Sequence, residues 1–505
     1  MKQKINKLIL FGFLLLILAP VVTINHESGK ISTIENRTLA AFPNFFDDMF
    51  HLNNSVKLEF ENWLNDNIGF REQFVQTASW IKFNVLGIKS NDKVHAGKDG
   101  WFFYTLDHNL QIAQGNYPMD KKMLESIRVN QEAVKQRLYE QGIEYILVLP
   151  VSKASIYPEM IQTGNYSIRK TLVDLVADYL EETTDIKIVR LKESLLEKKK
   201  EEQVFFKTDT HWNEIGAYTA YKTIIENMNK WGILKNLPVS VTFENAQRKG
   251  EFSAMLGNTN LLQEESFKQI VIPSQNARQI TDAEADEKYQ RVYEIMKQEA
   301  LGYQQTLYIN DKVMTPKVLM YGESMFASWH LPELMAETFS EFSYMWARNI
   351  NQEVVDLLKP DVVVYELTER YLNTLPNFNG DFICSDMKSF QSEIVNCNIP
   401  QKIVFGQPFS MNITVKNVSD KAWLKCENFR LGALAITGEN CIDTGLRAEI
   451  ESDEVVDIGE NYTFYFDDLV LDNMKCEKIR FTMLREGYQY FGEYVEIPIN
   501  RVNIK

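Results

Sequence analysis

The sequence between residues 318 and 324 indicates the class of fold. Val318-Leu319-Met320-Tyr321 is a continuous apolar run, and Gly322-Glu323-Ser324 follows it directly. A short apolar run that ends in a turn is typical of a parallel strand buried on both faces. Two further runs of this kind occur at residues 145–150 and 362–365, and the segments between the runs show helical periodicity. Helices between buried strands predict an α/β layered domain.

A second pattern begins near residue 385. From Phe409 onward, short alternating runs such as residues 411–415 and 462–466 recur between turn residues. This alternation predicts an antiparallel β-sandwich of about the size of an immunoglobulin-like module. In the first part of the chain, the charged and Gln-rich segment 263–299 is expected to be a solvated insertion.

The charge balance and the cysteines exclude several classes of protein. The 505 residues include 54 Lys and Arg against 69 Asp and Glu, a formal net charge of -15. Such an acidic surface repels phosphate backbones, so no nucleic-acid partner is expected. All five cysteines follow residue 383, which excludes a cysteine nucleophile or a thiolate metal site in the main body. Any disulfide is expected in that last part, with Cys426–Cys441 and Cys384–Cys397 as the local candidates.

The N-terminus predicts a membrane anchor. Lys2, Lys4 and Lys7 precede an uncharged apolar run at residues 8–24. The run is near the lower length limit for crossing a bilayer, and the flanking positive charge holds its start in the cytoplasm. A cleaved signal peptide is the alternative. The rest of the chain is expected to lie outside the cytoplasm in either case.

Three stretches of sequence could carry chemistry: residues 207–212, 321–324 and 366–370. The second and third are predicted at the carboxyl ends of buried strands, where open α/β sheets bind ligands. Ser324 on a strand-to-helix turn would expose its hydroxyl beside free backbone N–H groups. A hydroxyl nucleophile needs a base, and an imidazole base needs a carboxylate to orient it. His211 and Asp209 could supply both from one loop.

Plainer interpretations of the same residues stay open at this point. Asp209 could serve only as the N-cap of the following helix, and Ser324 could cap another helix. The charged cluster at residues 366–370 could be an ion-pair network. His330 is a rival base, although a helix would hold it out of phase with Ser324.

Asp209-Thr210-His211-Trp212, with Asn213 and Gly216-Ala217-Tyr218 behind it, resembles the DxHW block of the alginate O-acetyltransferase family. These proteins are SGNH-hydrolase-like, with a permuted order in which Asp and His precede Ser. Further matching blocks follow in the family's order at residues 36–39, 42–43, 67–71, 97–103, 150–153, 157–158, 250–252, 255–257 and 369–371. The resemblance implies Ser324 as nucleophile, His211 as base and Asp209 as the orienting acid. The chain departs from the family's usual Gly-Asp-Ser, because Glu323 precedes Ser324.

The resemblance also implies a function. We expect an extracytoplasmic O-acetyltransferase, anchored in a bacterial cell membrane by a single span, that passes acetyl groups through an acetyl-serine to hydroxyls of a polysaccharide. A membrane-bound O-acyltransferase would supply the acetyl group, with no cofactor and no metal. Arg370, Trp212 and Arg348 are candidates for substrate binding. A carbohydrate acetylesterase and a non-catalytic glycan-binding scaffold are the alternatives.

The expected domain organisation follows from these patterns. It comprises an anchor at residues 1–25, a stalk and helical lead segment at 26–95, an SGNH-like catalytic domain at 96–385 and a β-sandwich at 395–505. The last module resembles an immunoglobulin-like domain found beside bacterial surface enzymes, through Asn417, Trp423, Gly459 and residues 430–432 and 483–492. It could bind glycan, or it could be a rigid spacer.

Overall fold

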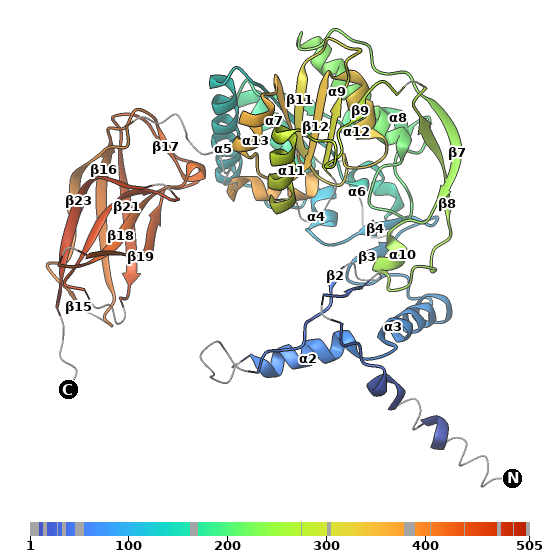
Figure 1. Ribbon diagram of the computed structural model, residues 1–505, viewed down its shortest axis with the longest axis horizontal. Coiled ribbons are helices and arrows are strands. Elements are labelled where there is room, and N and C mark those ends of the chain that lie inside the picture. The colour runs from blue at the N-terminus through green and yellow to red at the C-terminus, as the bar shows by residue number, and fades with distance from the viewer. Residues whose placement is uncertain are drawn as a thin grey trace.

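The structure is a computed structural model, and it describes residues 10–13, 18–27, 29–32, 37–45, 55–161, 170–273, 275–299, 305–377, 389–404, 406–438, 440–471, 476–487 and 489–500. Two folded parts stand out in Figure 1: a layered α/β unit and, beyond it, a C-terminal β-sandwich. This architecture confirms the predicted fold class.

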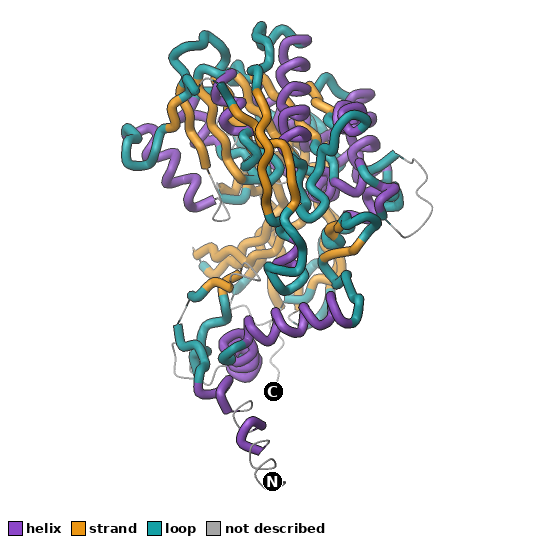
Figure 2. The backbone as a smooth tube through the Cα atoms, turned by 90° about the vertical axis from the view of Figure 1, so that its right-hand side faces the viewer, coloured by secondary structure: helices purple, strands orange, loops and turns teal. Residues whose placement is uncertain are grey.

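A seven-stranded sheet lies at the centre of the α/β unit, and Figure 2 shows it enclosed by helices. In spatial order its strands are β6 (Lys187–Arg190), β5 (Glu144–Leu149), β13 (Val362–Glu366), β11 (Lys317–Gly322), β12 (Glu341–Trp346), β10 (Gln305–Ile309) and β9 (Arg278–Gln279). The strands from β6 to β12 are parallel, whereas β10 and β9 run antiparallel to their neighbours. The parallel strands therefore share one carboxyl edge.

Several helices of this unit begin where the sequence supplies capping side chains. The surrounding helices are α5 (Lys121–Glu140), α7 (Leu172–Thr183), α8 (Lys192–Lys199), α9 (Glu214–Lys230), α11 (Glu287–Glu299), α12 (Leu331–Thr338) and α13 (Gln352–Leu358). Asp120 caps α5 by accepting a hydrogen bond from the N–H of Met123 at 2.8 Å. Asn213 caps α9 in the same way through the N–H of Gly216, at 3.0 Å. Such caps satisfy N–H groups that have no partner inside the helix.

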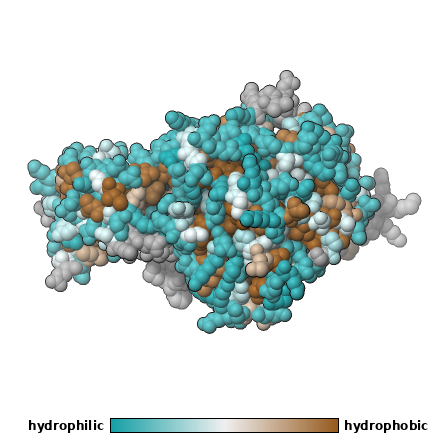
Figure 3. All heavy atoms as spheres, turned by 90° about the horizontal axis from the view of Figure 1, so that it is seen from above, coloured by the Kyte–Doolittle hydropathy of each residue, from teal (hydrophilic) through white to brown (hydrophobic). Residues whose placement is uncertain are grey.

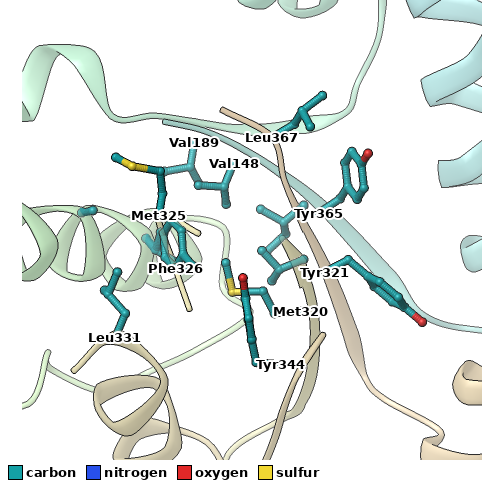
Figure 4. Packing of buried hydrophobic residues seen from close by; sticks show 14 of the residues in the cluster. Val148, Val189, Met320, Tyr321, Met325, Phe326, Leu331, Tyr344, Tyr365 and Leu367 are labelled. Atoms are coloured by element: carbon teal, nitrogen blue, oxygen red, sulfur yellow. The ribbon is translucent and has the colours of Figure 1, made fainter. Parts of the chain in front are cut away.

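The core of the α/β unit is built from the apolar strands. Figure 4 shows buried side chains of the core cluster from four neighbouring strands, with Val148 and Tyr344 on one face of the sheet and Tyr321 and Tyr365 on the other. Each of these side chains is at most 1% exposed. Full burial of one large apolar side chain contributes about 1.5–3 kcal/mol, so this cluster fixes the positions of the strand ends.

A lead segment precedes the sheet and packs on its later loops. Its elements are α2 (Val56–Asn67), α3 (Arg71–Trp80), the π-helix η1 (Ile81–Val85), β3 (Val94–Ala96) and β4 (Phe102–Tyr104). The hairpin β7 (Thr242–Arg248) and β8 (Glu265–Val271), with the short helix α10 (Phe252–Met255) between them, lies next to it (Figure 1).

The C-terminal part consists of two facing sheets. One has the order β14-β16-β21 and the other β15-β23-β22-β18-β19. Their bounds are β14 Ser392–Asn398, β15 Ile403–Val404, β16 Phe409–Asn417, β18 Phe429–Thr437, β19 Asn440–Glu449, β21 Asn461–Leu469, β22 Lys478–Arg485 and β23 Gln489–Asn500. Lys421 pairs with Glu140 of α5 at 2.8 Å, and Lys122 of α5 pairs with Glu451 at 2.9 Å. Seen from above, both parts carry separate apolar patches in a mostly hydrophilic surface (Figure 3).

The expected single-pass membrane topology is wrong. Among the described residues, no helix has the length and the apolar character needed to cross a membrane. Within the apolar run, residues 10–13 and 18–22 are helical. Residues 1–9, which include the three N-terminal lysines, and residues 14–17 lie outside the described residues.

Two further expectations are corrected. The segment 263–299 is not a solvated insertion, because β8 pairs with β7 and α11 buries Val292 and Met296 in the main core. The disulfide Cys426–Cys441 is not formed, since both residues are free thiols, the first buried and the second exposed. Cys384, the proposed partner of Cys397, lies outside the described residues.

Candidate active site

Four adjacent parallel strands deliver polar side chains to one edge of the sheet. Lys153 follows β5, Ser324 follows β11, Arg348 follows β12 and Arg370 follows β13. Ligand sites in open α/β sheets lie beyond the carboxyl ends of the strands, and this edge meets that condition.

The turn that carries Ser324 is tight and anchored. The backbone N–H of Phe326 donates to the carbonyl of Glu323 at 3.1 Å. Figure 4 shows Met325 and Phe326, directly after Ser324, among the buried side chains of the core. Gly322 is required before the turn, because a Cβ atom there would lie 2.6 Å from Oε2 of Glu366.

Ser324 is partly exposed, and its hydroxyl makes no hydrogen bond to any described residue. The backbone N–H groups of Ser324 and Met325 also make no hydrogen bond to any described residue. The predicted helix start is displaced, because α12 begins only at Leu331, after Trp329 and His330 in the left-handed conformation. The free N–H groups next to Ser324 therefore belong to a turn and not to a helix.

Asp209 and His211 lie in the loop between α8 and α9. The backbone N–H of Phe206 donates to the carbonyl of His211 at 3.2 Å, which closes the loop on itself. His211 Nδ1 lies 2.7 Å from Oδ1 of Asp209. The other carboxylate oxygen of Asp209 accepts from Arg248 at 3.1 Å and from the N–H of Glu251 at 3.3 Å. Asp209 thus orients the imidazole and is itself held from two sides.

The electrostatics suit an ion pair at these positions. Burial acts to raise the pKa of Asp209, but His211 and Arg248 outweigh it and hold this pKa well below its usual range. Burial lowers the pKa of His211, but Asp209 and Glu251 outweigh it and raise the pKa above its ordinary value of 6.5. Nε2 of His211 has no hydrogen-bond partner within the described ranges, so it is open to a ligand or a nucleophile.

Two aromatic contacts bring the Ser324 turn to the His211 loop. The ring of Phe326 lies 5.4 Å from Trp212 in an edge-on arrangement, and the ring of Trp329 lies 5.8 Å from His211. The structure therefore brings the three predicted catalytic residues into one region. No hydrogen bond joins Ser324 to His211 in the described part of the chain.

His330, the alternative candidate for the base, contacts a carboxylate outside the proposed triad. His330 Nδ1 lies 3.0 Å from Oε2 of Glu214 in α9. This contact is the main reason that the pKa of His330 is raised. His330 therefore serves an ion pair between α9 and the start of α12.

The three candidate substrate-binding residues differ in placement. Arg348 is exposed at the rim of the site. Arg370 is half-buried, and its positive charge acts to lower the pKa values of both His211 and Glu323. Trp212 is fully buried, so a substrate atom cannot reach it in this conformation.

Glu323, which precedes the nucleophile turn residue Ser324, contacts Arg348 and Glu366. Its Oε1 accepts from Nε of Arg348 at 3.1 Å, and its N–H donates to Glu366 at 2.7 Å. Burial raises the pKa of Glu323 to about 7 and that of Glu366 to about 8. Two buried carboxyl groups this close favour retention of a proton between them. Glu323 therefore supports the turn through Arg348.

Lys153 is a site residue for which no role was predicted. Its side chain is 3% exposed, and Nζ donates to the carbonyls of Phe206, Lys207 and Asp209 at 3.0, 3.1 and 2.6 Å. The ring of Phe252 lies 4.7 Å away. Burial lowers the pKa of this amine to about 7. Lys153 thereby fixes the backbone of the loop that carries Asp209 and His211.

Arg248 and Glu251 were also not predicted as site residues. They contact the catalytic loop from the region of the β7–β8 hairpin, which lies about 40 residues further along the chain. Gly250 between them is needed, since a Cβ atom there would lie 2.0 Å from the carbonyl oxygen of Thr208. The glycine is visible in the sequence, but its close contact with Thr208 is visible only in the structure. Ligand atoms of Asp209, His211 and Glu251 lie within 4.8 Å of one another. The hydrogen bonds already described account for this grouping.

Sequence comparisons relate this chain to acetyltransferases. A family model described as the SGNH hydrolase-like domain of the acetyltransferase AlgX matches residues 94–368. The probable alginate O-acetylase AlgJ of Pseudomonas putida is 23% identical over 316 residues, which cover 59% of this chain and 75% of that protein. The corresponding protein of Pseudomonas syringae pv. tomato is 24% identical over 314 residues, 58% of this chain and 73% of that protein.

Solved structures give weaker matches. Bacillus cereus PatB1 aligns with a TM-score of 0.40 and 17% identity over 56% of this chain and 97% of that chain. The O-acetyltransferase domain of Pseudomonas putida AlgJ aligns with a TM-score of 0.35 and 19% identity over 57% of this chain and 94% of that chain.

Proposed function

Because this chain belongs to the family of SGNH hydrolase-like acetyltransferases that includes AlgX, we propose that Ser324, His211 and Asp209 are its catalytic triad. The chain is an O-acetyltransferase that acts on a polysaccharide, as its curated relatives are named for alginate acetylation. One observation carries the residue assignment: His211, oriented by Asp209 at 2.7 Å, lies beside the turn that exposes the free hydroxyl of Ser324. The triad residues would then occur in the permuted order Asp, His, Ser.

The mechanism follows from these positions. Ser324 Oγ attacks the carbonyl carbon of an acetyl ester while Nε2 of His211 removes the hydroxyl proton. The free N–H groups of Ser324 and Met325 can stabilise the negative oxygen that forms. The leaving alcohol takes the proton from His211, and the acetyl group remains on Ser324 as an ester. A sugar hydroxyl then attacks the carbonyl carbon of this ester and gives its proton to His211. The bond from that carbon to Ser324 Oγ breaks, His211 returns the proton to Ser324, and the acetylated sugar is released.

The remaining assignments also belong to this proposal. A membrane-bound O-acyltransferase supplies the acetyl group in the cell, as the family resemblance implies. Residues 96–385 form the catalytic domain and residues 395–505 an accessory module. Arg370 and Arg348 contact the substrate, since both lie at the carboxyl edge of the sheet. Trp212 instead supports the nucleophile turn through Phe326.

The experiment that tests transfer compares two acceptors. The purified chain is given an acetyl donor ester with and without oligosaccharides, and products are identified by mass spectrometry. Acetylated sugar is expected to form faster than free acetate. Water is present at about 55 M, so transfer wins only if a bound hydroxyl gains effective molarity at the acyl-serine. Free acetate alone across a broad oligosaccharide panel would instead establish an esterase.

The pH dependence tests the role of His211. A general base must be neutral, so activity rises with pH through its pKa. We expect the acid limb of kcat/KM above the ordinary value of 6.5, because Asp209 raises the pKa of His211. Asp209→Asn should lower the rate by roughly 10³–10⁴-fold and move the limb to lower pH. The exposed Asp185→Asn should change neither. An unmoved acid limb in Asp209→Asn would contradict the assignment.

A further inference from the structure

A cavity of about 1060 Å³ lies between the lead segment and the catalytic unit. One wall comes from α3 and η1, and a second from the loops around β3 and β4. The third wall is α10 with the turn that follows it. Sites for small ligands usually measure about 300–1,000 Å³, so this cavity has room for more than one compact group.

The walls of this cavity are tied together. Asn258 Nδ2 donates to the carbonyl of Gln76 in α3 at 3.0 Å, and Asn91 Nδ2 donates to the carbonyl of Met255 in α10 at 2.9 Å. Gly257 has a φ of +90°, and a Cβ atom there would lie 2.4 Å from Oγ of Ser79. The close approach of α3 therefore depends on this glycine. Figure 1 shows α3, β3 and α10 next to one another, as these contacts require.

The lining combines aromatic rings with balanced polar groups. The rings of Phe83 and Tyr104 line the cavity. So do two lysines and two carboxylates: Lys82, Lys93, Asp92 and Glu251. Amides and hydroxyls of Ser79, Ser90 and Asn91 complete the polar part. A sugar chain presents flat carbon–hydrogen faces and many hydroxyls, which such walls can contact and hydrogen-bond.

One wall residue links the cavity to the catalytic loop. Glu251 lines the cavity, and its Oε1 accepts from the N–H of Thr210 at 3.0 Å. The same oxygen lies 3.7 Å from Nδ1 of His211. On the other wall, Tyr104 lies 5.7 Å from the guanidinium of Arg370. Single wall residues therefore separate the cavity from two residues of the site: Glu251 from His211, and Tyr104 from Arg370.

We propose that this cavity binds the acceptor: several sugar units of a hydroxyl-rich glycan without net charge. The inference rests on the proposed acetyl transfer, because it names the site and the charge class of its acceptor. The lining has equal numbers of positive and negative side chains, and the whole chain carries a net charge of -15. Such a charge repels a polyanionic glycan, so a neutral chain is the better fit.

Binding is measured by calorimetry on the full chain with Ser324→Ala, so that no turnover occurs. The probes are neutral hexasaccharides of glucose, mannose, galactose and N-acetylglucosamine, together with a hexamer of mannuronate. At least one neutral probe should bind more tightly than the mannuronate hexamer. Asp92→Trp, added to Ser324→Ala, fills the cavity and should raise the Kd about tenfold or more. Asp311→Trp, an equal change at an exposed position outside the cavity, should leave the Kd unchanged.

Three outcomes would overturn the inference: no binding of any neutral probe, tighter binding of mannuronate, or an unchanged Kd in Asp92→Trp. If Asp92→Trp fails to fold by circular dichroism, the double change Lys82→Ala and Lys93→Ala replaces it, with a rise in Kd of about threefold or more expected. Failure of the proposed function appears elsewhere, as an absence of acetyl transfer that depends on Ser324. The two failures are thus distinguishable.

Discussion

Ser324→Ala and His211→Ala are each expected to reduce acetate release from nitrophenyl acetate by roughly 10⁴-fold or more, because nucleophile and base act as one unit. For the same reason the double variant should be about as slow as either single variant. The measurement is the initial rate of nitrophenol release at a pH above the acid limb. Both substitutions are at sites with some solvent exposure, so the fold should be retained.

Ser328→Ala is the matched control, because Ser328 is an exposed serine in the same connection between β11 and α12. It should keep the rate of the unchanged chain. Losses in the two single variants that multiply in the double variant would contradict a Ser324–His211 unit. Full activity in Ser324→Ala would exclude Ser324 as the nucleophile, whereas no turnover even in the unchanged chain would favour the scaffold alternative.

Lys153→Met is expected to cost both stability and activity. The substitution removes the donor for the carbonyls of Phe206, Lys207 and Asp209, of which the first and the third accept in buried surroundings. Each buried polar group left without a partner costs about 1–3 kcal/mol, so we expect the free energy of unfolding to fall by about 3 kcal/mol. Removing a buried amine also removes its desolvation cost, which limits the total.

Urea unfolding measures the stability change, and the nitrophenyl acetate rate measures the effect on the loop. The rate should fall about 10²-fold, because a small displacement of His211 is enough to impair catalysis. Lys230→Met, at an exposed lysine of α9, should stay within about 0.5 kcal/mol of the unchanged chain. Equal stability and equal rates for both variants would show that Lys153 does not hold the loop.

Three of the predicted strands in the α/β unit have uninterrupted apolar sequence: β5, β11 and β13. Helices cover both faces of the sheet at these strands, so both sets of alternating side chains are apolar. A continuous apolar run therefore predicts a buried strand at each position. β12 was missed, since Glu341 and Ser343 interrupt its apolar pattern, yet both are buried in the sheet. α11 contains more charged and polar residues than apolar ones, so its sequence predicts a solvated segment. Its apolar residues Tyr289, Val292 and Met296 nevertheless pack into the core.

The sequence predicted only some of the residues of the candidate site. Asp209 and His211 are neighbours in one loop, so local spacing exposes their pairing. Lys153 and Arg248 reach the same loop from separate parts of the chain, and no local pattern encodes such contacts. The membrane anchor was predicted from an apolar run and the lysines before it, and the described helices do not support it. Contacts between distant residues and the length of a helix are fixed only when the chain folds, so local sequence patterns did not predict them.

The central claim is that Ser324 carries the acetyl group, and trapping that ester tests it most directly. The chain is mixed with nitrophenyl acetate, quenched in acid within the first turnover, digested and mapped by mass spectrometry. A covalent intermediate accumulates when its breakdown is slower than its formation, and Asp209→Asn can be used to slow both steps. We predict one acetyl group on the peptide that contains Ser324 and none on that peptide in Ser324→Ala. Acetylation confined to other residues, with Ser324 unmodified during turnover, would contradict the account.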